Sequence, residues 1–354
     1  MIYLDNAATT PVTKDVLNAM LPYFTEQFGN PSSLHQMGMR AKVAVTKARE
    51  QVARAINAEP EQIFFTSGAT ESNNWVISGF GYVMCSPYEH HSVSKRPNVS
   101  ELGSYMSLEE NLYEWSPDLV SHMYVNNETG EIYDVKSMAA VCKHNVVPFH
   151  TDATQAFGHV PVDVKQIGCD FLSLSGHKFH APKGIGILYI KDPDDFYSML
   201  YGGGQQKGLR SGTEPVPLIV GMGTAAELYN YNSDTEHYVK TMRDELKSYI
   251  LAEYPVIINE AKHHTNNILS VAFKDIQAEN LIYLLNMKGL CVSGGSACNS
   301  QLDTVSESIK ALQLPVDYVH GVIRFSFSHL NTMEEVKLAE QILHEAMAQL
   351  NALK

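Results

Sequence analysis

The sequence predicts an α/β protein in which a large domain, with a mostly parallel sheet flanked by helices, is followed by a smaller α+β domain. Three observations favour this fold. Short apolar runs alternate with helical patterns over the first two thirds of the chain, which is typical of βαβ units. Polar residues gather where several of these runs end, as they do at the ligand-binding edge of a parallel sheet. The chain has 354 residues, enough for one large domain or two smaller ones.

Strands are expected where short apolar or β-branched runs stop at turn residues. These runs are 63–66, 82–85, 119–125, 146–150, 170–174 and 184–190 in the large domain, and 256–258, 268–273, 290–293 and 322–327 in the small one. Helices are expected where apolar residues recur every three to four positions, at 14–21, 38–57, 134–145, 216–251 and after the capping box Thr332–Glu335. Residues 94–118 lack such periodicity and predict connecting structure. We expect the large domain to span 14–236, and the small domain to span 237–354 together with 1–13.

Composition and charge exclude several functional classes. A net charge of −13 disfavours a general nucleic-acid binder, which needs a basic surface for phosphates. No apolar run approaches the length of a membrane span, and the first residues have no signal-peptide pattern, so a cytoplasmic location is expected. The five cysteines are scattered without a CxxC pair, which favours neither a disulfide framework nor a zinc site. His263 and His264 have no further ligand at metal spacing, so no metal is expected.

Lys178 is the first candidate for chemistry. It follows the apolar run 170–174. An ammonium group at the end of a buried strand loses its hydration, which is unfavourable unless another group binds the nitrogen. One solution is a Schiff base with an aldehyde such as pyridoxal phosphate, and the alternative is a lysine that extends its ammonium into solvent. Four more polar residues follow equivalent strands, and this coincidence favours a ligand site: His90, Asn127, Asp152 and Gln155.

Pyridoxal phosphate needs further groups that this chain can supply. Asp152 can face the pyridine nitrogen, His90 the ring, and Asn127 or Gln155 the phenolic oxygen. Residues 68–70 lie between a strand and a helix, where backbone N–H groups and the helix dipole favour an anion such as phosphate. Taken alone, such a loop is more often an ordinary capped helix start.

Nine motifs follow one another along essentially the whole chain. They are Tyr3–Thr10, Gly68–Glu71, Glu89-His90, Val125–Glu128, Thr151–Gln155, Ser175–Lys178, Arg210–Thr213, Ser293–Cys298 and Ile323–Ser326. Together they resemble the cysteine desulfurases, class V of the pyridoxal-phosphate-dependent aminotransferase fold. The resemblance implies a fold-type I transferase that depends on pyridoxal phosphate.

For the cofactor, the resemblance implies a role at each matching position. Lys178 would hold the cofactor as a Schiff base, and Asp152 would pair with its pyridine nitrogen. His90 would stack on the ring and shuttle protons, and Gln155 would reach the phenolic oxygen. The phosphate would be bound by Ala69, Thr70, Ser175 and His177, with Thr213 arriving from the partner subunit of an obligate homodimer.

For the substrate, the resemblance implies that L-cysteine binds through its carboxylate to Asn127 and Arg324, Asn127 also touching the cofactor. Cys298 would attack the substrate sulfur, which gives alanine and a Cys298 persulfide that passes its sulfur to an acceptor protein. Its neighbours are Gly, Ser, Ala and Asn, which suits a working thiol on a loop. The spacing from Cys298 to Arg324 resembles the subgroup with a long catalytic loop.

Two other enzymatic activities and one non-catalytic role stay open. The fold also permits a selenocysteine lyase or a cysteine-sulfinate desulfinase, in which the leaving group departs without a thiol. A non-catalytic docking partner in sulfur transfer is a third possibility, which the intact Lys178, Asp152, Cys298 and Arg324 disfavour. Compared with the family, the segment 79–119 is short and the chain ends at Lys354 without the extension that often docks iron–sulfur scaffolds. The acceptor is therefore left open between an iron–sulfur scaffold, a tRNA-thiolation enzyme and DNA-modification machinery.

Overall fold

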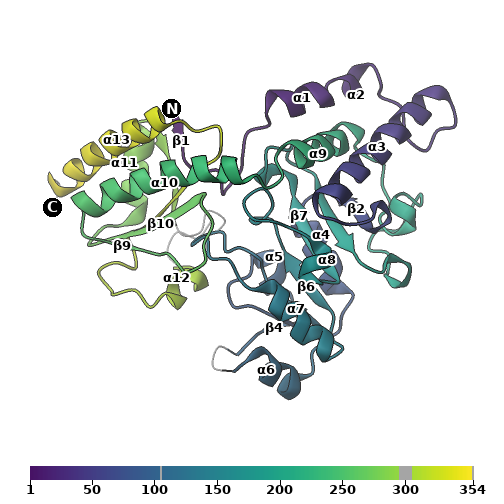
Figure 1. Cartoon of the computed structure of the whole chain (residues 1–354), viewed down its shortest axis with the longest axis horizontal. Helices are drawn as coiled ribbons and strands as arrows, with labels where there is room; N and C mark the ends of the chain where they lie inside the picture. Colours follow the sequence, from purple (N-terminus) through teal and green to yellow (C-terminus); the bar gives the residue numbers. More distant parts are fainter. Residues whose placement is uncertain (104–105, 295–304, 353–354) are drawn as a thin grey trace. The chain divides into compact units, whose positions relative to one another are not determined.

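The computed structural model describes residues 1–103, 106–294 and 305–352. They form two compact units (Figure 1). The small unit consists of Met1–Thr9, Val125–Ile132 and Asn232–Lys354, and the large unit of Thr10–Tyr124 and Tyr133–Tyr231. The units change after Thr9 and after Tyr231, each a few residues before the predicted domain boundaries after residues 13 and 236. The sequence places 125–132 in the large domain, whereas the structure assigns it to the small unit, because Ile132 N–H donates to the His263 carbonyl and Thr265 N–H to the Gly130 carbonyl.

A seven-stranded sheet forms the centre of the large unit, in the order β2-β8-β7-β6-β5-β3-β4. The strands are β2 (Ile63–Thr66), β3 (Val83–Cys85), β4 (Val99–Glu101), β5 (Leu119–Ser121), β6 (Phe149–Asp152), β7 (Phe171–Ser175) and β8 (Gly186–Ile190). β4, β3, β5, β6 and β7 are parallel to one another, while β8 runs antiparallel to both β7 and β2. β2 is therefore parallel to β7, and only β8 is reversed.

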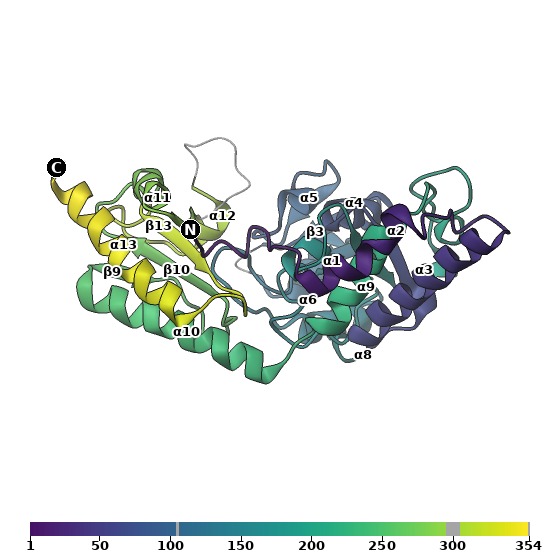
Figure 2. The same cartoon turned by 90° about the horizontal axis from the view of Figure 1, so that it is seen from above.

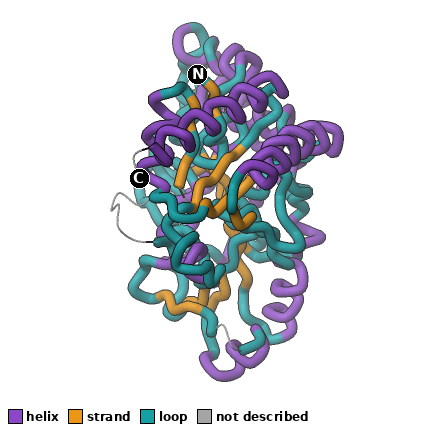
Figure 3. Tube along the Cα trace, turned by 90° about the vertical axis from the view of Figure 1, so that its left-hand side faces the viewer, coloured by secondary structure: helices purple, strands orange, loops and turns teal. Residues whose placement is uncertain are grey.

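Helices surround this sheet, and Figure 3 distinguishes them by colour from the strands. They are α1 (Lys14–Met20), α2 (Pro22–Thr25), α3 (Gln36–Ala55), α4 (Ala69–Ser78), α5 (His91–Ser94), α6 (Leu108–Trp115), α7 (Val135–His144), α8 (Val164–Ile167) and α9 (Val216–Leu228). Four short 3-10 turns complete the unit: η1 (Pro60–Gln62), η2 (Gly176–Lys178), η3 (Pro193–Asp195) and η4 (Gln206–Gly208). α3 packs closely on α9, because a Cβ at Gly223 would lie only 2.6 Å from the Ala48 Cα.

Three sequence-based expectations for local structure need correction. Residues 94–118 contain β4 and α6 rather than connecting structure alone. The regular strand expected at 119–125 ends at Ser121, although the N–H groups of His122 and Tyr124 still donate to the carbonyls of His150 and Asp152 on β6. The single helix expected at 216–251 is two helices, α9 and α10, separated at Asn232, whose side-chain oxygen accepts the N–H groups of Asp234 and Thr235 and so caps the second.

The small unit has a four-stranded antiparallel sheet in the order β12-β13-β10-β9 and a two-stranded pair β1-β11. Its strands are β1 (Ile2–Tyr3), β9 (Val256–Ile258), β10 (Ile268–Phe273), β11 (Leu290–Cys291), β12 (Ser293–Gly294) and β13 (Val322–Ser326). Its helices are α10 (Ser233–Glu253), α11 (Ala278–Met287), α12 (Glu307–Ala311) and α13 (Met333–Ala352). The expected capping box opens α13, since Glu335 N–H donates to the Thr332 hydroxyl and Thr332 N–H to the Glu335 carboxylate.

Along β10 and β13, successive side chains point to opposite faces of the sheet, and one of these faces is apolar. Leu269, Val271 and Phe273 belong to the same hydrophobic core as Ile323 and Phe325, which residues of α10, α11 and α13 complete. Figure 2 shows these helices beside the strands. The intervening residue of β13, Arg324, is paired in register with Ser270 on β10 and Ser293 on β12, and therefore lies on the opposite face.

Candidate active site

The carboxyl ends of four parallel strands of the large unit bring most predicted site residues to one edge of the sheet. β2 is followed by Ser67–Thr70, β3 by the segment with Glu89 and His90, β6 by 153–155, and β7 by 176–178. α4, which begins in the first of these segments, packs against α5, β6 and β7 (Figure 1). Such an edge is where ligands bind in open α/β sheets.

The backbone at the N-terminus of α4 has a geometry that suits an anion. Gly68 is the N-cap residue and provides no side-chain cap, so the first N–H groups of α4, from Ala69 and Thr70, are left for another acceptor. A Cβ on Gly68 would lie 3.6 Å from the Ser175 hydroxyl oxygen, which places Ser175 at the same cradle. The structure thus brings together three of the residues predicted for phosphate binding: Ala69, Thr70 and Ser175.

A partly buried ion pair offsets the negative charge that would oppose an anion there. Glu71, in the first turn of α4, accepts Arg210 Nε at 2.8 Å and Arg210 Nη2 at 3.1 Å. Burial works to raise the pKa of Glu71, but the bonds from Arg210 and Ser67 outweigh it and hold the pKa below its ordinary value. Arg210 therefore acts on the cradle through Glu71.

Asp152, the last residue of β6, is buried and firmly held. Its Oδ2 accepts Asn73 Nδ2 at 2.7 Å and its Oδ1 accepts the Thr154 N–H at 3.0 Å. An ionised carboxylate offers about four acceptor positions, so these two bonds leave room for a protonated ring nitrogen. Asn73 is a site residue that sequence reasoning missed, because its position inside α4 gave no signal.

His90 caps the short helix α5 with its ring. Its Nδ1 accepts the Ser92 N–H at 3.1 Å and lies 2.8 Å from the Ser92 hydroxyl. Burial, together with the nearby cations Lys178 and His91, lowers the pKa of His90 and outweighs the opposing charge of Asp152. His90 is therefore neutral at physiological pH, and its electrostatic neighbours include both Asp152 and Lys178.

Lys178 lies in the turn η2 that directly follows β7, and it is half-buried. The turn is fixed by Thr10, whose N–H and hydroxyl both donate to the His177 carbonyl. Burial, aided by Lys178 and Lys183, lowers the pKa of His177 to about 4, so its ring is neutral and can donate one N–H to an acceptor. Gln155 follows β6 at the same edge and is also buried.

Glu89 stands in the motif Glu89-His90, but the sequence assigned it no role of its own. Its Oε1 accepts the Ser86 hydroxyl at 2.8 Å and the Met123 N–H, while its Oε2 is buried with no hydrogen-bond partner among the described residues. Burial and the charge of Asp152 raise the pKa of Glu89 to about 8 despite these two bonds. Glu89 is therefore a protonated carboxylic acid at neutral pH.

Arg324 and Asn127 belong to the small unit. The guanidinium is buried, with Nη1 donating to the Asn127 carbonyl at 2.7 Å and Nη2 to Asp5 Oδ1 at 3.0 Å. Asn127 therefore holds Arg324 through its backbone. These two bonds use two of the five guanidinium N–H groups, and the Nε is buried without a partner among the residues described. The predicted pair with a substrate carboxylate stays a prediction.

Two predicted site residues provide less information. Cys298 lies outside the described residues. Thr213 is exposed on the large unit, at the end of the glycine-rich segment 202–213.

In the described parts of the chain, no three His, Cys, Asp or Glu side chains are arranged to hold a metal ion, and no helix is long and apolar enough to cross a membrane.

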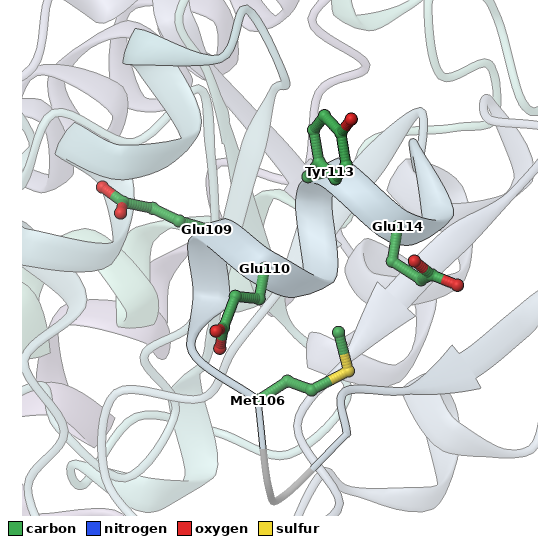
Figure 4. Close-up of a pocket in the computed structure, with 5 residues that line it drawn as sticks. All are labelled: Met106, Glu109, Glu110, Tyr113 and Glu114. Atoms are coloured by element: carbon green, nitrogen blue, oxygen red, sulfur yellow. The ribbon is translucent and has the colours of Figure 1, made fainter.

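A hollow on the surface of α6 is separate from these residues (Figure 4). It is lined by Met106, Glu109, Glu110, Tyr113 and Glu114. None of the predicted site residues lines it, and its acidic lining is unsuited to a phosphate. We therefore assign the chemistry to the sheet edge and not to this hollow.

The residues at the sheet edge fit pyridoxal phosphate. The uncapped first turn of α4 fits the phosphate, and the buried carboxylate of Asp152 retains free acceptor positions for the pyridine nitrogen. Lys178 follows the adjacent strand β7, and His90 is electrostatically coupled to both Lys178 and Asp152. The donor set thus matches the cofactor's phosphate, ring nitrogen and aldehyde.

Comparison with known proteins identifies the family. The aminotransferase class-V family matches residues 2–338. The chain is similar to the cysteine desulfurase IscS of Methanosarcina thermophila, with 40% identity over 374 aligned positions that cover 99% of this chain and 92% of that protein. A solved structure described as a NifS-like protein superimposes with a TM-score of 0.89 at 33% identity, covering 98% of this chain and 99% of the other. The chain belongs to the class-V aminotransferase family.

Within this family the chain groups with the cysteine desulfurases, so the resemblance seen in the sequence is confirmed. The predicted α/β fold with a mostly parallel sheet is confirmed as well, and it is the fold-type I arrangement of the NifS-like enzymes. A further solved structure, SspA in complex with cysteine, superimposes with a TM-score of 0.81 at 32% identity and covers 94% of this chain and 100% of the other.

Proposed function

We propose that the protein is a cysteine desulfurase that uses pyridoxal phosphate to convert L-cysteine into alanine and protein-bound sulfur. The observation that carries the proposal is the group of Lys178, Asp152, His90 and the uncapped N-terminus of α4 at one edge of the sheet. Full-length likeness to cysteine desulfurases supports it. A structural relative described in complex with cysteine supports the choice of substrate.

Each residue of the large unit has a separate task in this proposal. The Lys178 amine would hold the cofactor covalently, and Thr70, Ser175 and His177 would bind its phosphate with the Ala69 N–H. Asp152, kept ionised, would retain the proton on the pyridine nitrogen, and Gln155 would donate to the phenolic oxygen. When bound, pyridoxal phosphate supplies an electron sink that acidifies the Cα–H bond of the substrate and so weakens the bond between the substrate's Cβ and sulfur.

Sulfur transfer is assigned to residues whose roles come from the resemblance. Arg324 would bind the substrate carboxylate with the N–H groups that Asp5 and Asn127 leave free. The Cys298 thiolate would attack the substrate sulfur, forming one S–S bond while the carbon–sulfur bond breaks. Balanced over the cycle, cysteine and the Cys298 thiol give alanine and a Cys298 persulfide. The final acceptor would be a protein of iron–sulfur assembly or tRNA thiolation.

The assembly is proposed to be a homodimer in the cytoplasm in which Thr213 completes the partner's phosphate site. Its exposure supports this role, because Thr213 has room to face another subunit. Several large apolar side chains between α1 and the start of α3 are also exposed, as expected for a surface that a second copy covers: Leu17, Leu21, Phe24, Phe28, Leu34 and Met39, the last of which lies in α3. A solution mass of one chain at micromolar concentration would contradict the dimer.

The central test is alanine release from L-cysteine by the cofactor-loaded enzyme, measured for the native protein and for Cys298→Ala. We expect the variant to keep the visible absorption of the Lys178-bound cofactor and to lose alanine formation. Undiminished turnover of L-cysteine by the variant would overturn Cys298 as the sulfur acceptor. A protein that takes up no pyridoxal phosphate would overturn the cofactor assignment. Cys142→Ala, at a buried cysteine on α7, is the matched control and should leave turnover unchanged.

A further inference from the structure

A continuous hydrogen-bonded chain joins His90 to Asp152 within the large unit. Asn73 Nδ2 lies 2.7 Å from Asp152 Oδ2 and 2.9 Å from the Ser92 hydroxyl oxygen. The same hydroxyl oxygen lies 2.8 Å from His90 Nδ1. Asn73 and Ser92 are buried, so water does not compete for these bonds. Neither residue belongs to the set that the family resemblance assigns to the cofactor or the substrate.

The direction of every bond in this chain follows from the chemistry of its ends. An amide nitrogen only donates, so Asn73 Nδ2 gives one hydrogen to Asp152 and its second hydrogen to Ser92. At the other end, the Ser92 N–H donates to His90 Nδ1, which must therefore carry a lone pair. The Ser92 hydroxyl, which already accepts from Asn73, then donates to the same Nδ1.

The consequence concerns the two ring nitrogens of His90. Two donors at Nδ1 leave the single proton of the neutral ring on Nε2. A second proton could enter only at Nδ1, where it would break both bonds from Ser92. His90 can therefore donate a hydrogen bond through Nε2, but it cannot accept a proton there while it remains in this state.

We propose that Ser92 and Asn73 are positioning residues that hold His90 as an Nε2–H donor and tie its ring to the Asp152 carboxylate. The inference rests on the proposed function, in which His90 would stack on the cofactor ring and Asp152 would pair with the ring nitrogen. It revises the expectation that His90 shuttles protons. While Ser92 holds this state, Nε2–H would donate a hydrogen bond and Nε2 would not serve as the base.

The test measures the tautomer of His90 directly, by ¹⁵N NMR of histidine-labelled full-length protein without cofactor, so that it does not depend on turnover. The His90 resonances are assigned by their loss in His90→Asn. We expect a protonated Nε2 and an unprotonated, hydrogen-bonded Nδ1. The opposite tautomer would overturn the proposal. The spectra are recorded at fixed pH, because the charges of Asp152, Lys178 and His91 all act on His90.

Three variants separate positioning from a merely structural role. Ser92→Ala removes one of two donors to Nδ1 and should shift the tautomer ratio toward Nδ1–H about fivefold, the worth of one ordinary hydrogen bond. Ser92→Thr keeps a hydroxyl and should restore the native ratio. Ser94→Ala, on the same helix, should change nothing, because the Ser94 hydroxyl makes no hydrogen bond to any residue described here. An unchanged ratio in Ser92→Ala would overturn the role of Ser92.

Asn73→Ala supplies an independent measurement should Ser92→Ala not fold. It breaks the link to Asp152 but leaves the Ser92–His90 pair, whose hydroxyl is then free to rotate. We expect a shift in the same direction, about twofold and smaller than for Ser92→Ala. A native His90 spectrum in a folded Asn73→Ala protein would overturn the coupling to Asp152. Failure of the desulfurase proposal would instead appear as missing cofactor uptake or missing alanine, with these spectra unaffected.

Discussion

Replacing Glu89 by glutamine should remove a pH dependence of stability that this one side chain causes. Glu89 is only 7% exposed, and burial with the nearby charge of Asp152 raises its pKa to about 8 from an ordinary 4.5. At neutral pH it is therefore a carboxylic acid in the folded protein and a carboxylate in the unfolded chain. Glutamine has the shape of the protonated acid and can still accept from Ser86 and Met123.

The direction and size of the change in the free energy of unfolding with pH follow from proton linkage. Between the unfolded and folded pKa values the folded state holds a proton that the unfolded state lacks, so the free energy of unfolding falls as pH rises and levels off above the folded pKa. A full proton is worth about 1.4 kcal/mol per pH unit. Because Glu89 becomes about half ionised at its folded pKa, the loss between pH 7 and pH 8 is about 1 kcal/mol. Glutamine cannot ionise and should lose none of it.

This pH interval separates Glu89 from the other perturbed groups. Burial lowers the pKa of His122 and of His150 to about 4, so both stabilise the fold as pH rises toward the ordinary histidine value of 6.5 and contribute no further change above it. The same sign holds for His177. Burial raises the pKa of Glu128 to about 7 against the opposing bond from Ser306, so most of its effect falls below the interval.

The assay is urea denaturation of the cofactor-free protein at one protein concentration, at pH 7 and at pH 8. The native protein should lose about 1 kcal/mol more than Glu89→Gln over this step. Glu109→Gln, which changes an exposed carboxylate on α6, is the matched control and should behave like the native protein. Equal losses in the native protein and in Glu89→Gln would refute a protonated Glu89.

Two further predictions concern the cradle and the small unit. In Gly186→Ala the new Cβ would lie 2.6 Å from the Gly68 Cα, so we expect the protein to be destabilised by about 1–3 kcal/mol. We also expect it to bind pyridoxal phosphate more weakly, as measured by titrating the apoprotein with the cofactor. An unchanged affinity for pyridoxal phosphate would show that Gly68 is not part of the phosphate cradle. Arg324→Lys removes the guanidinium N–H groups that bind Asp5, Asn127 and, in the proposal, the substrate carboxylate. The KM for cysteine should therefore rise about 10- to 100-fold. An unchanged KM would contradict binding of the substrate carboxylate by Arg324.

The strand ends could be predicted from the sequence because local pattern decides them. An apolar run that stops at a turn residue is visible without the fold, and the parallel order then brings His90, Asp152 and Lys178 to one edge. The same logic did not indicate which unit contains Asn127. Its run of apolar residues continues past Ser121, but pairing with the segment around His263 draws 125–132 into the small unit. That pairing joins residues more than a hundred positions apart, so local pattern does not reveal it.

The helix α6 was missed although a signal for it exists. Ser107 and Glu110 form a capping box, with the Glu110 N–H donating to the Ser107 hydroxyl and the Ser107 N–H to the Glu110 carboxylate. A capping box predicts a helix start. The eight residues Leu108–Trp115 are too few to show a clear helical period. A start signal without periodicity therefore identifies short helices better than periodicity alone.

No local pattern in the sequence shows what Asn73, Ser92 and Glu89 do, although Glu89 stands in a family motif, and the physical reason is the same for all three. Each is a common polar residue whose role arises from burial and from a partner on another element. Burial decides that water cannot replace the partner, and the partner decides which nitrogen or oxygen carries the proton. Asn73 would be an exposed amide if α4 turned its other face to β6. The family motifs therefore indicate which cofactor and which reaction to expect, whereas the protonation states on which that reaction depends are set by packing between α4, α5 and β6.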